Sequence, residues 1–496
     1  MPIRNIYTIL LALLLSVLCY LTSSKNRYAG VFSEAMQIVE REALVQVPRR
    51  EIFRAAMDGM LKSLDPNSQF IADDQYQQLN EDINQEFGGV GLQIRVDSQT
   101  DELTAVRAIP ATPAAAAGLL RGDVIVEING KSTRGMSSSA AVTLIRGPIG
   151  STVNLLVKRG QDDPFEVSLT RARIPVDSVA GDTRKDDGEW NFFLESHPHI
   201  GYIRLEKFGE RSVEEMKRAL KQVNDKAALI FDLRSNLGGL LSGSIEIADM
   251  FLPPNRLIVS IKGRGETVLE RHHTVNEPLF RPEIPLVVLV NRHSASASEI
   301  VAACLQDHER AIIIGERSYG KGTVQNLIPL EFGRSYIKLT VASYWRPSNK
   351  NIDRTLFYKM RAEDMDNGEW GVSPDPGFEC ELSAMDSALI RAARMLRDTD
   401  PNRTDLISVQ QIDNSDGGDD APGRLDDHEL PLLSDEPPHS SNTPDMHPLQ
   451  ENLESYDEEE VIIDSTREVP RWEDIDIPIL KAIEYLEKQL TNKNAA

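Results

Sequence analysis

Three short runs of apolar, mostly β-branched residues constrain the fold of this chain more than any other feature. They span residues 228–231, 284–290 and 311–315, and each run ends at a turn that contains glycine or serine. Runs of this length and composition are typical of strands that are buried on both faces, and such strands occur in parallel α/β sheets. The sequence therefore predicts an α/β core whose functional groups lie in the turns after its strands.

The second run leads into a serine-rich turn, residues 294–298, and then into an alanine-rich segment, residues 299–307, with helical spacing. A strand-to-helix turn of this kind places a hydroxyl where open α/β sheets bind ligands, beside the unpaired N–H groups of a helix start. The serines can instead cap the helix. The residues alone do not decide between a cap and a nucleophile, nor among Ser294, Ser296 and Ser298.

A lysine between two glycines, Lys321, follows the third run. A lysine acts as a general base only when its pKa falls, and burial among apolar neighbours lowers it. A serine–lysine pair is an established variant of the catalytic triad. The two turns together therefore indicate a serine–lysine hydrolase.

Two other interpretations use the same part of the chain. Residues 315–321 match most of a phosphate-binding loop, but Gly322 stands where that loop requires Ser or Thr, and the candidate metal-binding Asp232 lies upstream. A Ser–His–Asp triad would need one of three histidines, and we expect most of the nine histidines of the chain to lie at the surface. The three candidates are His272, His273 and His293.

Four motifs give the chain a specific resemblance: Ser294-Ala-Ser-Ala-Ser-Glu-Ile300, Gln306-Asp307, Gly315-Glu316 and Gly320-Lys-Gly-Thr-Val-Gln325. Over most of residues 30–395 the chain resembles the carboxyl-terminal processing proteases, also called tail-specific proteases. The resemblance implies a multidomain α/β fold with a catalytic core of the ClpP/crotonase-like type. It also implies that Ser296 is the nucleophile, that Lys321 is the general base, and that Gln325 orients the lysine.

The first run continues into a Gly-Gly turn and a helix candidate, residues 228–241. By itself this pattern indicates an ordinary strand-to-helix connection. The resemblance implies that the N–H groups of Gly238 and Ala297 form an oxyanion hole, where each donor typically contributes roughly 3 kcal/mol to transition-state stabilisation. Leu237 departs from the family, which usually has proline at this position.

Residues 85–174 resemble a PDZ domain, with a Gly-Leu-Leu-Arg-Gly-Asp-Val-Ile segment at 118–125 and a helix candidate at 136–145. A PDZ groove binds the C-terminus of a protein as an added strand and receives its carboxylate on backbone N–H groups. The substrate-binding loop implied here comprises Gly89, Val90, Gly91 and Leu92. The resemblance predicts protein or peptide substrates with apolar C-termini; the glycines can alternatively form only a bulge.

Residues 6–22 are mainly apolar and uncharged. They are marginally long enough for the roughly 20 residues that cross a bilayer, and a cleaved signal peptide is the alternative. We expect a bacterial inner-membrane anchor, residues 1–24, with the catalytic part in the periplasm or outside the cell. Residues 25–84 resemble the family's N-terminal helical region, which would brace the PDZ domain or pair with another subunit as a homo-oligomer.

Most of the net charge of −23 comes from one stretch, because residues 400–468 hold about twenty acidic and three basic residues. This composition predicts a disordered insertion, residues 398–468, rather than a surface for a basic partner. An amphipathic helix should close the chain within residues 469–496. Its expected apolar stripe is Ile479, Leu480, Ile483, Leu486 and Leu490.

We therefore expect a peptidase domain, residues 175–397, that acts as a serine endopeptidase on C-termini bound by the PDZ domain. Cys304 should be buried, and we predict no disulfide, metal site or cofactor and no nucleic-acid partner. The alternative function is a membrane-tethered PDZ scaffold with an inactive hydrolase domain.

Overall fold

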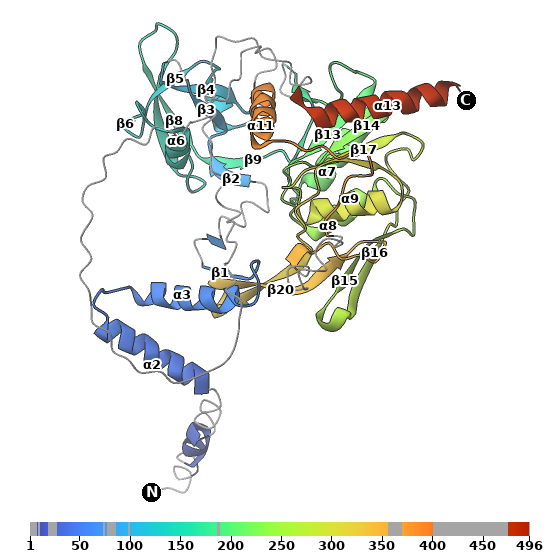
Figure 1. Ribbon diagram of the computed structural model, residues 1–496. Helices are drawn as coiled ribbons and strands as arrows, with labels where there is room; N and C mark the ends of the chain where they lie inside the picture. The colour runs from blue at the N-terminus through green and yellow to red at the C-terminus, as the bar shows by residue number, and fades with distance from the viewer. Residues whose placement is uncertain are drawn as a thin grey trace, which may run out of the picture.

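The computed structural model describes residues 7, 10–17, 27–72, 75–76, 86–97, 100–185, 189–355, 370–399 and 475–495. Figure 1 shows a pair of N-terminal helices, a small sheet with one helix on it, and a larger α/β part. The predicted acidic insertion lies outside the described residues, apart from residues 398–399.

The N-terminal region forms two helices, α2 (Arg27–Glu42) and α3 (Arg49–Lys62). The predicted helical region is interrupted at Pro48, which caps α3 with an extended backbone (φ −55°, ψ 137°). After α3, β1 (Gln69–Ile71) pairs antiparallel with β20 (Ser335–Trp345). The region predicted to end at residue 84 thus contributes a strand to a sheet of the larger part.

The PDZ part contains a sheet in the order β3-β4-β5-β7-β8, with β6 paired to β5, and a separate β2–β9 pair. Its predicted helix is confirmed as α6, which begins after Ser137, whose Oγ accepts a hydrogen bond from the Ala140 N–H at 3.2 Å. The elements are β2 (Glu86–Gly89), β3 (Leu92–Val96), β4 (Leu103–Ala108), α5 (Pro113–Ala116), β5 (Val124–Ile128), β6 (Lys131–Ser132), α6 (Ser138–Ile145), β7 (Thr152–Lys158), β8 (Phe165–Thr170) and β9 (Ala172–Pro175).

The three apolar runs are neighbouring strands of one sheet, as predicted. The sheet order is β10-β13-β14-β17-β18, and β13, β14, β17 and β18 are parallel. Every residue of β14 and β17 is buried. The strands are β10 (Val179–Ala180), β13 (Ile200–Leu205), β14 (Ala228–Asp232), β17 (Leu286–Val290) and β18 (Ile312–Gly315).

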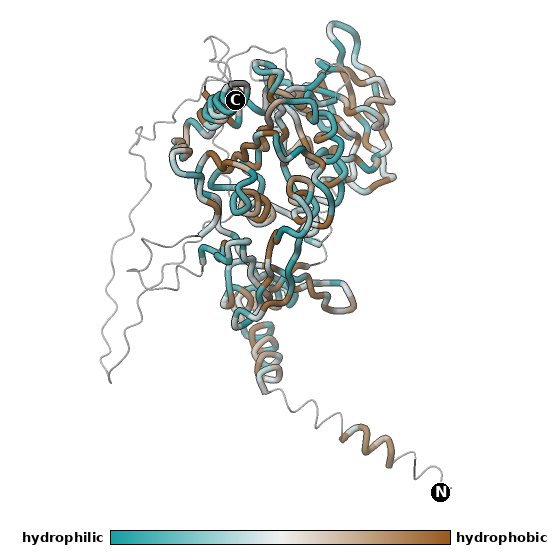
Figure 2. Tube along the Cα trace, turned by 90° about the vertical axis from the view of Figure 1, so that its right-hand side faces the viewer, coloured by the Kyte–Doolittle hydropathy of each residue, from teal (hydrophilic) through white to brown (hydrophobic). Residues whose placement is uncertain are grey.

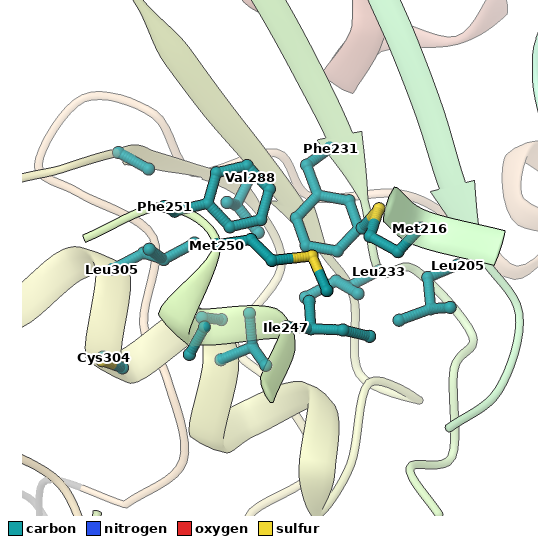
Figure 3. Packing of buried hydrophobic residues seen from close by; sticks show 14 of the residues in the cluster. Leu205, Met216, Phe231, Leu233, Ile247, Met250, Phe251, Val288, Cys304 and Leu305 are labelled. Atoms are coloured by element: carbon teal, nitrogen blue, oxygen red, sulfur yellow. The ribbon is translucent and has the colours of Figure 1, made fainter. Parts of the chain in front are cut away.

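Helices cover both faces of this sheet, so that alternate residues of a strand enter different cores. Phe231 joins the cluster that also contains residues of α7 (Ser212–Val223), α8 (Leu241–Asp249) and α9 (Ala297–Asp307). Figure 3 shows Phe231 beside Phe251 in this cluster, and their rings stack 5.6 Å apart. Cys304 is buried in the same cluster, as predicted.

The opposite face of the sheet, which includes Ile230, is covered by α13 (Ile477–Ala495). This confirms the predicted closing helix. Its buried residues include Ile479, Ile483 and Leu486, whereas the predicted stripe was wrong at Leu480, which is 41% exposed. The buried stripe is narrower than predicted because only one face of the helix contacts the sheet, and Leu480 lies outside that face.

A second sheet has the order β1-β20-β15-β16, with β19 paired to β20. The sequence analysis did not predict it. Its apolar runs are short, at residues 257–259 of β15 and 327–330 of β19, and many residues of β16 and β19 are exposed. The remaining elements are β11 (Thr183–Arg184), β12 (Trp190–Asn191), β15 (Leu257–Lys262), η1 (Arg264–Glu266), β16 (Val268–His273), β19 (Thr323–Leu330), η2 (Glu331–Gly333) and α11 (Ala384–Thr399).

The described part of the N-terminal segment, residues 10–17, is helical and apolar, as the brown colour in Figure 2 shows. Among the described residues, no helix combines the length and the apolar composition that crossing a membrane requires.

The packing of α13 predicts unequal effects of two substitutions on the same helix. Leu486→Ala should destabilise the fold by about 2–5 kcal/mol because it leaves a cavity against the sheet, whereas Leu480→Ala should change stability by less than about 1 kcal/mol. Urea denaturation followed by tryptophan fluorescence compares the two variants. Equal losses of stability in the two variants would contradict the packing of α13 on the sheet through the face that contains Leu486.

Candidate active site

Three turns meet at the carboxyl ends of the parallel strands: the glycine turn (residues 233–239) after β14, the serine turn (291–296) after β17, and the lysine loop (316–322) after β18. Backbone hydrogen bonds join them, because the Ala295 N–H donates to the Asn236 carbonyl (3.0 Å) and the Tyr319 N–H donates to the Ser294 carbonyl (2.9 Å). The strand order therefore brings together the three motifs that the sequence analysis singled out.

The structure distinguishes the three serines. The Ser294 hydroxyl donates to the Leu233 carbonyl at 2.9 Å, and the Ser298 hydroxyl donates to the Asn236 carbonyl at 2.9 Å. Ser296 is the N-cap of α9 and has a left-handed backbone (φ 57°, ψ −113°), which is strained for a residue with a side chain. Burial raises the pKa of the neighbouring Tyr344 to about 12, and the Ser296 side chain acts in the opposite direction. Ser294 and Ser298 thus hold the turns in place, and Ser296 is the strained member.

Lys321 is the last residue but one of the lysine loop, and β19 begins at Thr323. Burial, and next the charge of nearby Lys338, lowers the pKa of Lys321 to about 8, while Glu299 acts in the opposite direction. The flanking glycine is required sterically, since a Cβ at Gly322 would lie 2.2 Å from the backbone nitrogen of Asp353. This close backbone approach contributes to the burial of the lysine.

Glu299 connects the serine turn to the lysine loop. Its Oε2 accepts hydrogen bonds from the Ser296 and Lys321 N–H groups, each at 2.8 Å. Its Oε1 accepts from the Gly320 N–H (2.6 Å) and the Ser318 hydroxyl (2.5 Å). Burial raises the pKa of Glu299 to about 7, and these four donors favour its ionised form.

The sequence analysis did not assign a role to Glu299. The signal was present, because Ser296 and Glu299 have the S-x-x-E spacing of a capping box before an apolar helix. The spacing explains the bond to the Ser296 N–H. The bonds to the lysine loop join residues about twenty positions apart, and no local pattern reveals them.

Gly238 lies directly against the serine turn. It has a left-handed backbone (φ 99°), and a Cβ there would be 2.8 Å from the Ser296 Cβ and 3.0 Å from the Ala297 nitrogen. Its N–H donates to the Asn236 Oδ1 at 2.8 Å. Among the residues that the structure describes, the Ala297 N–H has no hydrogen-bond partner, as is usual for the first residue of a helix. Both expected oxyanion donors therefore lie beside Ser296, but one of them is already bonded.

The Gln325 side chain contacts two threonines. Its Nε2 donates to the Thr323 Oγ1 at 2.7 Å and to the Thr340 Oγ1 at 3.3 Å. Thr340 in turn donates to Asp65 (2.9 Å) in the segment after α3. Within the described part of the chain, the Lys321 Nζ donates no hydrogen bond to Gln325, so the orienting role of Gln325 stays a prediction.

The alternative interpretations lack the groups they need. The Gly320 and Lys321 N–H groups, which would bind a phosphate, already bind the Glu299 carboxylate. Asp232 is paired with Arg234 at 2.7 Å rather than placed to bind a metal. No group of metal-ligating side chains occurs in the described ranges. His272 and His273 lie on β16, outside the three turns.

His293 lies inside the serine turn, in a half-buried position. Burial lowers its pKa, with the neighbouring Arg292 as the next cause.

The predicted PDZ loop connects β2 to β3. Val90 is buried in the PDZ core, and its carbonyl accepts the Ala114 N–H at 2.9 Å. Gly91 has a left-handed backbone (φ 74°), and a Cβ there would lie 2.3 Å from the Thr112 Oγ1. The fold thus requires Gly91 for local geometry. Peptide binding by Gly89, Val90, Gly91 and Leu92 stays a prediction.

Known proteins match both parts of the chain. The model of peptidase family S41 matches residues 199–361, and a PDZ model matches residues 104–159. A carboxy-terminal-processing protease of Bartonella bacilliformis is 35% identical over 339 residues, which cover 66% of this chain and 74% of that protein. A carboxyl-terminal-processing protease of a Picosynechococcus species is 36% identical, covering 62% and 71%.

Among solved structures, the photosystem II D1 C-terminal processing protease is 27% identical and has a TM-score of 0.38, with 71% of this chain and 86% of that one covered. The sequence matches extend over both the PDZ part and the parallel sheet that carries the three turns. The chain therefore belongs to the carboxyl-terminal processing proteases of peptidase family S41, which are serine-type peptidases with a PDZ domain.

Proposed function

We propose that this protease cleaves proteins near their C-termini with Ser296 as nucleophile and Lys321 as general base. The observation that carries the proposal is the pKa of Lys321, about 8, in a buried loop that shares the Glu299 carboxylate with the Ser296 turn. A lysine with this pKa is partly neutral near neutral pH, as a general base must be.

In the proposed reaction, neutral Lys321 takes the hydroxyl proton of Ser296 as the serine oxygen attacks the scissile carbonyl carbon. The C–N bond then breaks, the lysine returns its proton to the leaving amine, and an acyl-enzyme remains. Water attacks the acyl carbon and loses a proton to Lys321; the bond between the Ser296 Oγ and the acyl carbon then breaks. Lys321 returns that proton to the Ser296 Oγ, and the product leaves as a carboxylic acid that ionises in solution. The same pair of residues thereby serves both half-reactions.

The Ala297 and Gly238 N–H groups would stabilise the oxyanion of each tetrahedral intermediate. Ala297 supports this assignment by its position at the start of α9, where its N–H has no intrahelical acceptor. Gly238 must share its N–H between the Asn236 Oδ1 and the oxyanion, or exchange one for the other. The PDZ loop at Gly89–Leu92 would hold the substrate's C-terminal carboxylate while an upstream bond reaches Ser296.

Removal of either proposed catalytic side chain should abolish cleavage without affecting peptide capture. Ser296→Ala and Lys321→Ala should each lower kcat by at least about 1,000-fold. The assay is cleavage of a peptide with an apolar C-terminus, and a fluorescence titration measures its binding. Near-normal turnover by Lys321→Ala would disprove the dyad. An inactive wild-type protein that still binds the peptide would instead support the scaffold alternative.

Cleavage should rise with pH. Only neutral Lys321 accepts the proton, so kcat/KM should increase with a midpoint near pH 8. Lys338→Gln removes a like charge and should move that midpoint upward, lowering the rate at pH 7. Initial rates between pH 5.5 and 10.5 measure both curves. A midpoint near 10.5, the pKa of an ordinary lysine, would contradict a buried Lys321 as the general base.

Glu299→Gln should decrease turnover, since an amide cannot accept all four hydrogen bonds that the carboxylate accepts. We expect kcat to fall about 10-fold to 100-fold, because small displacements of reacting groups have effects of this size. Ser318→Ala removes one of the four donors, together with the acceptor of the Val372 N–H (2.7 Å), and should have a smaller effect on kcat. Steady-state kinetics compare the variants, and unchanged kcat in Glu299→Gln would refute a positioning role.

A further inference from the structure

The glycine turn is connected to a buried ion pair. Arg234 lies in this turn, four residues before Gly238, with only 10% of its side chain exposed. Its Nη2 donates to the Asp232 Oδ2 at 2.7 Å. Its Nη1 and Nη2 donate to Asp476 at 2.7 and 3.0 Å. One guanidinium thus fixes the turn to two buried carboxylates, and bidentate pairs of this kind restrict geometry strongly.

Asp476 is brought to Arg234 by the last helix of the chain. It directly precedes α13, is 1% exposed, and its Oδ1 accepts the Ile479 N–H at 3.3 Å. The apolar face of α13, including Ile483 and Leu486, packs on the parallel sheet. The position of the carboxylate therefore depends on the docking of α13.

The helix before the acidic stretch reaches the same pair from the other side. Asp232 accepts the Tyr202 hydroxyl at 2.7 Å, and the Tyr202 oxygen accepts from the Arg394 Nη2 of α11 at 2.9 Å. Charged groups around the pair are therefore contributed by α11 and by Asp476, the residue before α13. These two helices flank the long acidic stretch in the sequence, yet they meet at one ion-pair network beside the glycine turn.

We propose that Asp476 is a positioning residue, through which α13 holds Arg234 and the Gly238 turn in the geometry that the oxyanion hole requires. The inference rests on the proposed function. It makes activity dependent on a residue 180 positions after the nucleophile Ser296, beyond the acidic stretch. Loss of the Asp476 carboxylate would leave the buried Arg234 paired with Asp232 alone. We expect the glycine turn, which carries Arg234, to shift as a result.

The test compares Asp476→Asn, Asp476→Glu and Glu487→Gln in the full-length protein. Glu487 lies on α13 and pairs with His199 at 2.7 Å, and it is half exposed, so Glu487→Gln is the matched control for helix docking. For Asp476→Asn we expect kcat to fall about 10-fold to 100-fold, with KM within about twofold and the pH midpoint unchanged. Asp476→Glu should recover part of the rate, and Glu487→Gln should match the wild type.

Hydrogen–deuterium exchange supplies a second readout that does not need activity. Amides of residues 233–239 should exchange faster in Asp476→Asn than in Glu487→Gln, whereas the α13 amides should remain protected in both. The inference is overturned if Asp476→Asn keeps its kcat and its exchange pattern, or if Glu487→Gln loses as much activity. Failure of the proposed function would give a different result: the wild-type protein would not cleave the peptide, or Ser296→Ala would cleave it equally fast.

Discussion

The carboxylate of Glu299 is the interaction on which the site depends. Strand order alone places the serine turn and the lysine loop at one edge of the sheet. It does not fix the conformation of either segment or the distance between them. Four donors from both segments converge on this buried side chain and restrict both the conformation and the distance. A buried carboxylate is stable only when its oxygens are satisfied, so the fold cannot keep Glu299 buried without holding the two segments together.

The parallel sheet could be predicted because its strands are buried on both faces. A strand of this kind has a continuous run of apolar residues, which can be recognised in the sequence. The second sheet could not be predicted, since β16 and β19 contain runs of consecutive exposed residues, and polar residues such as Lys338 and Thr340 interrupt the apolar residues of β20. The break between α2 and α3 was marked by Pro48, but the surrounding helix formers extend on both sides of it. Helix α13 was predicted from its apolar spacing, and the error at Leu480 reflects how narrow a face the sheet covers.

For the candidate site, as for the fold, the sequence revealed the local motifs but not the contacts between distant residues. Residue types and spacing identified the serine turn and Lys321, and the family resemblance selected Ser296. The structure adds a physical reason for that choice, because Ser294 and Ser298 are bonded to carbonyls of the glycine turn. Long-range partners remained hidden: Glu299 with Gly320, Arg234 with Asp476, and Gln325 with Thr340. Each of these contacts joins residues whose proximity follows only from the tertiary fold.

The lowered pKa that the proposed role of Lys321 requires destabilises the folded protein. The pKa of Lys321 is about 8 in the folded protein against 10.5 for an ordinary lysine, so at pH values below 8 its burial opposes folding by roughly 3 kcal/mol. This opposition declines as the pH rises from 8 to 10.5, where the unfolded chain also loses the proton. Interactions that do not titrate near neutral pH must offset it there. The Arg234 pair and the docked α13 supply such interactions beside the strands that carry the site, which is consistent with the general finding that functional groups are held in unfavourable states by the packing around them.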